Sequence, residues 1–256
     1  MIFVALPAYN EGEGIATLLR DITRTAREFM PGLDLTVVVV DDGSSDNTAE
    51  AAEAEFGRLE AEGQGRVRFL LLRHPQNKGL AEAVKTGLFY CVDKVGPHDA
   101  ILTMDADNSH TPGLIPHMIR QIYEGYDVVI ASRFRPGARV IGLSLYRQVL
   151  SAGASVLLRV LFPIPGVRDY TCGFRAYRGE LIRKVMSENP NFISETGFTV
   201  MVDLLLKLRK EKGVVLMSEV PLLLRYDQKL SSSKMNVGRT VRQTLSLVRR
   251  RLLGLP

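Results

Sequence analysis

The sequence has only two cysteines and no apolar run of membrane-spanning length. Cys91 and Cys172 lie far apart and form no C-x-x-C pair, which argues against a disulfide framework and a structural zinc site and favours a reducing cytosol. Cys91 has the helical spacing of a small core residue. The first apolar run covers residues 2–6 and no basic segment precedes it, so we interpret it as a buried strand and not as a signal peptide.

The longest largely apolar stretch, residues 140–165, is interrupted by Arg147 and Arg159. A membrane-spanning helix needs about 20 apolar residues, so we expect no transmembrane helix.

Acidic residues are scarce in the last part of the chain. Residues 225–256 hold eight Lys or Arg against one acid, Asp227, so this tail is strongly positive although the whole chain carries only +5. A local basic patch predicts a polyanionic surface or ligand. Aromatic residues do not alternate with the basic ones, so we do not expect nucleic acid as a partner.

Short apolar runs rich in β-branched residues alternate with segments of helical spacing in the first half of the chain. The predicted strands are residues 2–6, 35–40, 67–72, 100–104 and 127–131. The predicted helices are residues 14–29, 46–62, 80–95 and 113–123. Continuous apolar strands that alternate with helices are typical of a mostly parallel sheet with helices on both faces, so we predict a doubly wound α/β fold.

The second half of the chain has a less regular pattern. We predict amphipathic helix and loop in residues 132–166, a strand that enters a turn in DYTCGFRAYR, a helix at 194–212 and a strand at 214–224. No repeat or linker divides the chain, so we predict a single domain of residues 1–256.

Polar loops follow three of the predicted strands: PAYNEGEG, DDGSSDNT and MDADNSH. Ligands of such sheets bind where loops leave the carboxyl ends of the strands, so the three loops should converge on one crevice. Asp105 and Asp107 are two residues apart, and extended backbone directs both side chains to one side. Two carboxylates at that spacing suit Mg²⁺ or Mn²⁺ on a diphosphate.

In DDGSSDNT, Gly43 permits a tight turn and Ser45 or Asp46 can cap the next helix. Capping explains one acid and not two, so we assign Asp42, and with it Asp41, to base or ribose recognition. The stretch NKGLAEAVKTG opens a helix at Lys78, where an anion site and a plain helix cap are both open.

These segments, together with DVVIASR, DYTCGFRAYR and SSSKM, resemble the family 2 glycosyltransferases of GT-A fold, in particular the polyprenol (dolichol) phosphate mannosyltransferase branch. The resemblance covers nearly the whole chain. It implies a Rossmann-like GT-A fold and metal-dependent inverting transfer of a hexose, with mannose from GDP-mannose as the first expectation, to a polyprenyl phosphate lipid.

The resemblance also assigns roles to matching residues. It assigns Asp107, Arg133 and Arg147 to catalysis, with both arginines on the donor diphosphate and the acceptor phosphate. The donor-binding residues it implies are Pro7, Tyr9, Glu11, Val40, Asp41, Asp42, Lys78, Asp105, Ala106, Asp107, Arg133, Arg225 and Lys234. Asp105 and Asp107 would hold the metal. The family often has Gln where this chain has Ser109, so Ser109, His110 or water remain options for the third ligand.

The spacing between Arg225 and Lys234 is longer than the family's usual spacer, which makes Lys234 the less secure of the two. In the same reading, residues 1–133 bind the nucleotide sugar, residues 134–235 form the acceptor side, and residues 236–256 are a basic amphipathic helix.

A phosphate monoester acceptor has a second pKa of about 6 and needs no strong general base. Glu195 is the candidate base if the acceptor is an alcohol instead.

The C-terminal helix has apolar residues at i+3 and i+4 spacing among arginines. It either lies on anionic lipid or packs on the domain with solvated arginines. With the apolar stretch 140–165, it suits a peripheral enzyme at the cytoplasmic face of a membrane, and a membrane-embedded protein partner is possible.

Two alternatives remain open. One is transfer from a UDP-sugar to a lipid phosphate or a saccharide alcohol, and the other is a nucleotide-sugar-binding protein without turnover. A dinucleotide dehydrogenase is disfavoured because no G-x-G-x-x-G follows the first strand.

Overall fold

The computed structural model describes residues 1–62, 66–189, 191–211, 213–230 and 237–255. Seven strands form one sheet in the order β3-β2-β1-β4-β7-β5-β8. The strands are β1 (Ile2–Ala8), β2 (Leu35–Asp41), β3 (Val67–Arg73), β4 (Ala100–Thr103), β5 (Val128–Ser132), β7 (Arg175–Arg178) and β8 (Met217–Pro221). All neighbours pair in parallel except β7, which runs antiparallel between β4 and β5. The α/β prediction is therefore confirmed, with one reversed strand in the middle.

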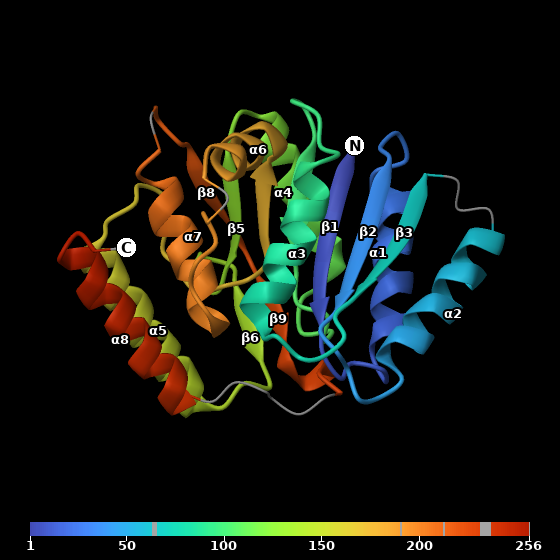
Figure 1. Ribbon diagram of the computed structural model, residues 1–256, viewed down its shortest axis with the longest axis horizontal. Coiled ribbons are helices and arrows are strands. Elements are labelled where there is room, and N and C mark those ends of the chain that lie inside the picture. The colour runs from blue at the N-terminus through green and yellow to red at the C-terminus, as the bar shows by residue number, and fades with distance from the viewer. Residues whose placement is uncertain (63–65, 190, 212, 231–236, 256) are drawn as a thin grey trace.

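Helices cover both faces of the sheet (Figure 1). They are α1 (Ile15–Phe29), α2 (Thr48–Ala61), α3 (Leu80–Val92), α4 (Ile115–Tyr123), α5 (Leu145–Leu161), α6 (Gly179–Glu188), α7 (Val200–Leu208) and α8 (Val237–Leu252). In Figure 1, α3, α6 and α7 lie in front of the sheet, and α1 and α4 lie behind it. No helix within the described ranges meets the length and hydrophobicity that crossing a membrane requires.

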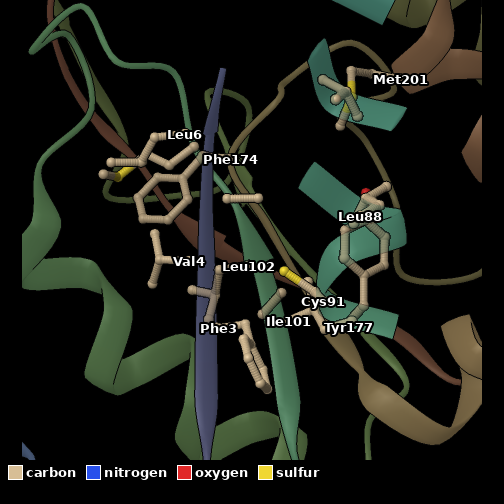
Figure 2. Packing of buried hydrophobic residues seen from close by; sticks show 14 of the residues in the cluster. Phe3, Val4, Leu6, Leu88, Cys91, Ile101, Leu102, Phe174, Tyr177 and Met201 are labelled. Carbon is tan, nitrogen blue, oxygen red and sulfur yellow. The ribbon is translucent and has the colours of Figure 1, made fainter. Parts of the chain in front are cut away.

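The core lies between these layers, and α3 approaches the sheet closely at Gly87. A Cβ added to Gly87 would lie 3.1 Å from the Cβ of Ala5, so the absence of a side chain lets the helix sit directly on β1. Cys91, one turn later, is fully buried beside Ile101 and Tyr177 (Figure 2). Burial raises the pKa of its thiol to about 12, which confirms Cys91 as an inert core residue.

The second half of the chain departs in detail from the prediction. In the DYTCGFRAYR segment a loop comes first and leads into β7, whereas we expected a strand followed by a turn. The helix expected at 194–212 is a short 3₁₀ turn, η2 (Gly197–Thr199), followed by α7. The strand expected at 214–224 divides into β8, which pairs with β5, and β9 (Leu223–Arg225), which belongs to a second sheet.

A second, two-stranded sheet lies beside the carboxyl ends of the main strands. It pairs β6 (Arg139–Ile141) in parallel with β9. Leu224 of β9 also bridges to His110, and the backbone N–H of Arg225 donates to the carbonyl of Ser109 at 2.8 Å. The chain that follows β9, which includes the 3₁₀ turn η3 (Tyr226–Gln228), is thereby held against the MDADNSH loop.

Candidate active site

The acidic pair lies in the loop that follows β4, at the lower edge of the sheet in Figure 1. The side chain of Asp105 is 40% exposed, and among the described residues its carboxylate has no hydrogen-bond partner. Asp107 is buried, and its Oδ1 accepts hydrogen bonds from the Ser109 hydroxyl at 2.6 Å and the Ser109 N–H at 3.0 Å. One carboxylate is thus open to a ligand and the other is held in place.

Asp107 is paired with Lys229, a residue that the sequence did not single out. The ammonium of Lys229 contacts Oδ2 of Asp107 and lies 5.6 Å from the ring centroid of Tyr226. Burial by itself would raise the pKa of Asp107, but Lys229, His110 and the Ser109 hydroxyl outweigh it and keep that pKa below its usual value. Burial likewise opposes the charge on Lys229, and the Asp107 carboxylate raises its pKa.

Both residues proposed as a third metal ligand, Ser109 and His110, already contact the acidic pair. The Ser109 hydroxyl is used on Asp107. Nδ1 of His110 accepts a hydrogen bond from the N–H of Asp105 at 3.3 Å. In a neutral ring the proton therefore lies on Nε2, which is 3.9 Å from Asp105 Oδ2. The described residues contain no group of three or more His, Cys, Asp or Glu side chains that could hold a metal. The acidic pair therefore fits a cation that takes most of its oxygens from a diphosphate and water, as Mg²⁺ commonly does.

The loop before β7 forms the wall behind Asp105. A Cβ added to Gly173 would lie 3.1 Å from Asp105 Oδ1, so this glycine leaves room for the carboxylate. The Thr103 hydroxyl donates to the Gly173 carbonyl at 2.7 Å. Arg175, fully buried, donates to the carbonyls of Tyr170, Cys172 and Met201 and so fixes the loop from behind.

Arg133 is held by this same loop. Its Nε and Nη2 donate to the two oxygens of the fully buried Asp169 at 2.8 and 2.7 Å, and Nη2 also contacts Thr171. Burial would raise the pKa of Asp169, but the Arg133 charge and these hydrogen bonds lower it. Arg133 therefore enters the site with two of its nitrogens already committed to protein groups, and its phosphate role remains a prediction.

Asp41 and Asp42 point into the protein. Both are nearly fully buried. Asp42 accepts the N–H groups of Lys78 and Gly79 at 2.9 and 2.8 Å and contacts Nδ1 of His74 at 2.7 Å. Asp41 Oδ1 accepts the N–H of Ser44 at 3.0 Å. In this arrangement Asp42 fixes the loop from His74 to Gly79, and direct contact with a base or ribose has no support from its hydrogen bonds.

The loops after β1 and β2 are joined to each other. The N–H of Asn10 donates to the Ser44 hydroxyl at 2.9 Å, and the N–H of Ser45 donates to Asn10 Oδ1 at 2.8 Å. Glu11 is buried and donates its N–H to Thr48 Oγ1 at 2.8 Å. The expected convergence of the polar loops is thus observed, and it brings Glu11 into electrostatic reach of Lys229.

The remaining predicted residues lie in different environments. Pro7 and Tyr9 are half-buried at the end of β1, and Lys78 is exposed. Val40 and Ala106 are buried, so the side chain of Val40 packs in the core near Gly87 and leaves only backbone for a donor. Lys234 lies outside the described residues.

Two more predicted basic residues already have protein partners. Arg147, in the first turn of α5, donates to the Tyr226 hydroxyl at 2.9 Å. Arg225 is paired with Asp227 at 2.9 Å.

The C-terminal helix joins the domain through ion pairs. Leu247 and Val248 are buried, Arg251 pairs with the buried Asp203, and Arg250 contacts Glu195 at 2.6 Å. The packing alternative is therefore correct for one side of α8. Glu195, the candidate base for an alcohol acceptor, is bound to an arginine.

Residues 3–186 match the family model described as glycosyl transferase family 2. The chain belongs to this family. It is 32% identical over 221 residues to a dolichol-phosphate mannosyltransferase of Pyrococcus furiosus, an alignment that covers 86% of this chain and 55% of the relative. It is 28% identical over 242 residues to a polyprenol monophosphomannose synthase of Mycolicibacterium smegmatis, covering 94% and 83% of the two chains.

The fold of this family 2 glycosyltransferase is also found among solved structures. A glucosyl-3-phosphoglycerate synthase from Mycobacterium tuberculosis, in complex with Mn²⁺, UDP and glucosyl-3-phosphoglycerate, superposes with a TM-score of 0.64. The two sequences are 20% identical, and the match covers all of this chain and 81% of the other. The GT-A prediction is confirmed.

Proposed function

We propose that this glycosyltransferase transfers a hexose, mannose from GDP-mannose first of all, to the phosphate of a polyprenyl lipid with inversion at the anomeric carbon. The observation that carries the proposal is the open carboxylate of Asp105 beside Asp107, at the carboxyl edge of the sheet, within electrostatic reach of Arg133. The two mannosyl-transferring relatives support the sugar and the lipid class.

The cofactor we propose is Mg²⁺ or Mn²⁺, held by Asp105 and Asp107. A divalent cation there would neutralise charge on the departing diphosphate. Arg133, which lies within electrostatic reach of Asp105, would stabilise the same charge, because the Asp169 pair holds its guanidinium at a fixed position. Preorganised charge of this kind costs no reorientation during the reaction.

Arg147 is our candidate for the acceptor phosphate. Its hydrogen bond to Tyr226 connects the first turn of α5 with the segment that carries Lys229. In the reaction an acceptor phosphate oxygen forms a bond to the anomeric carbon, the bond from that carbon to the diphosphate breaks, and the nucleoside diphosphate leaves. No proton has to be removed from a dianionic phosphate monoester.

A saccharide alcohol as acceptor is the less favoured candidate. An alcohol needs a general base, and the carboxylate of Glu195, the candidate base, is already bound to the Arg250 guanidinium at 2.6 Å.

The decisive experiment is a transfer assay with radiolabelled GDP-mannose, GDP-glucose, UDP-glucose and UDP-N-acetylglucosamine, polyprenyl phosphate or polyprenol, and Mg²⁺, Mn²⁺ or EDTA. We expect labelled glycolipid only with the phosphate acceptor and a divalent cation, and most of it from GDP-mannose. Product from a UDP-sugar or from polyprenol would select the alternative transferase. Donor binding without any product, in every combination, would select a non-catalytic nucleotide-sugar-binding protein.

We further propose that the protein acts as a peripheral enzyme on the anionic, cytoplasmic face of a membrane. Helices α5 and α8 lie at the same end of the molecule, opposite α1 and α2 (Figure 1). Large apolar side chains on α5 are strongly exposed, among them Leu145, Val149 and Val160 at 79%, 70% and 70%. Leu245 of α8 is exposed at 52%, and the exposed Arg242 and Arg249 of the same helix supply positive charge. The same exposed surface is where we propose that a membrane-embedded protein partner would bind.

Vesicle flotation tests this surface. We expect the wild-type protein to bind vesicles that contain phosphatidylserine, and the double substitution Val149→Asp with Leu245→Asp to abolish binding without loss of thermal stability, because both side chains are exposed. Equal binding of wild-type and variant protein would refute the proposed surface.

A further inference from the structure

The ammonium of Lys229 contacts Oδ2 of Asp107, the carboxylate oxygen that a divalent cation would also need. Both side chains of this ion pair are nearly buried, with exposures of 10% for Lys229 and 11% for Asp107. The other oxygen of Asp107 already accepts two hydrogen bonds from Ser109. Both oxygens of Asp107 are therefore engaged by protein groups, whereas the carboxylate of Asp105 accepts no hydrogen bond from the described residues.

A divalent cation bound to both carboxylates would have to take an oxygen of Asp107. The ammonium carries one positive charge and the cation two. At one nearly buried carboxylate these charges repel each other strongly, because little water is present to screen them. The ammonium of Lys229 and the cation therefore compete for Asp107 Oδ2.

We propose that Lys229 is a resident counter-ion of Asp107, which a divalent cation must displace in order to bind the acidic pair. This inference rests on the proposed cation site. It predicts weak cation affinity in the absence of nucleotide, because binding has to break a nearly buried, charge-assisted ion pair. A bound diphosphate would favour the exchange, since its negative charge stabilises both the cation and the released ammonium.

The segment around Lys229 gives the exchange a structural connection to the acceptor side. Tyr226 lies against the Lys229 ammonium through its ring and accepts a hydrogen bond from Arg147 through its hydroxyl. Release of Lys229 therefore changes the surroundings of the residue that contacts Arg147.

The first test uses the wild-type protein and labels lysine amines with an acetylating reagent, with the modified residues located by tandem mass spectrometry. We expect Lys229 to react slowly in EDTA and several times faster at saturating Mg²⁺ with GDP. Lys85 is the internal control, because its ion pair with Glu82 lies on the exposed surface of α3. Unchanged reactivity of Lys229 at saturating Mg²⁺ would overturn the proposal.

The second test measures Mn²⁺ binding by electron paramagnetic resonance, with and without GDP. Lys229→Met should bind Mn²⁺ roughly tenfold or more tightly than the wild-type protein without GDP, because the competing charge is gone. Lys229→Arg should stay close to wild type, and Lys85→Met is the matched control for removal of one positive charge. Circular dichroism would verify the fold of each variant. Equal or weaker Mn²⁺ binding by folded Lys229→Met contradicts the inference.

These outcomes separate the inference from the proposed function. If sugar transfer requires a divalent cation but Lys229→Met gains no affinity, the transferase stands and the counter-ion role falls. If no variant binds Mn²⁺ with or without GDP, and transfer proceeds in EDTA, the cation site falls and the counter-ion role falls with it.

Discussion

The substitution Asp169→Asn tests whether the loop before β7 supports the site through charge. Asp169 is fully buried, and its oxygens accept hydrogen bonds from the backbone and side chain of Arg133 and from the N–H groups of Thr171 and Cys172. Asparagine has nearly the same shape but replaces one oxygen by an NH₂ group. In either orientation that NH₂ group would face at least two N–H donors and leave the Arg133 charge without its carboxylate.

Removal of one partner from a buried ion pair costs about 3–5 kcal/mol. The side chain of Arg133 is 16% exposed, so water can recover part of this cost, and we expect the lower end, about 3 kcal/mol of unfolding free energy at pH 7. Glu124→Gln is the matched control, because its ion pair with Arg120 is exposed on α4 and the residue after it. We expect Glu124→Gln to change the unfolding free energy by less than about 1 kcal/mol.

The lowered pKa of Asp169 determines how the difference in unfolding free energy between wild type and Asp169→Asn depends on pH. The folded-state pKa lies below the unfolded-state value of about 3.9, so the wild-type pair contributes its full stability above that value and loses it as the pH falls toward the folded-state pKa. The gap between wild type and Asp169→Asn should therefore be constant from about pH 5 to 8 and narrow only in more acidic solution. Urea unfolding at several pH values measures this difference in unfolding free energy. A difference near zero at pH 7 would refute the argument.

Three further predictions concern other parts of the site. Asp107→Ala should reduce sugar transfer by more than about a hundredfold while circular dichroism reports an intact fold, and full turnover would exclude the acidic pair as the catalytic centre. Gly43→Ala should destabilise the protein by about 2 kcal/mol or more in urea, since Gly43 has φ of 67° and an added Cβ would lie 2.3 Å from the backbone carbon of Gln76; a neutral result would contradict that geometry. Arg175→Met should lower the unfolding free energy by at least about 3 kcal/mol because three buried carbonyls lose their donor, and retention of wild-type stability would argue against this role for the side chain.

Local sequence patterns were sufficient for the first half of the fold. The five expected strands there all form, with ends that differ by at most two residues, because apolar residues dominate each segment, as in the fully buried β2. The direction of β7 was not predictable in the same way. A four-residue strand carries no local signal of whether it pairs in parallel, and its place between β4 and β5 depends on contacts across more than forty residues of chain.

The same distinction holds for the site. The position of Asp105 and Asp107 followed from the strand before them, but the orientation of Asp42 depended on where the distant backbone of Lys78 and Gly79 returns to it. Lys229 had no motif of its own. Its one available signal was the unusual length of the segment between Arg225 and Lys234, which brings an extra lysine next to the acidic loop.

The C-terminal helix has one side packed on the domain and another side exposed, so a deletion and a point substitution perturb different properties. A deletion of residues 237–256 would remove exposed Leu245, but it would also uncover Asp203 and Glu195, which lose Arg251 and Arg250. Deletion should therefore weaken vesicle binding and lower thermal stability together, because Glu195 loses its arginine and the buried Asp203 keeps, among the described residues, only its ion pair with Lys207. The exposed double substitution on α5 and α8 should affect vesicle binding only. If the deletion left the melting temperature unchanged, the ion pairs that hold α8 to α7 would contribute nothing, and the helix would act on the lipid surface alone.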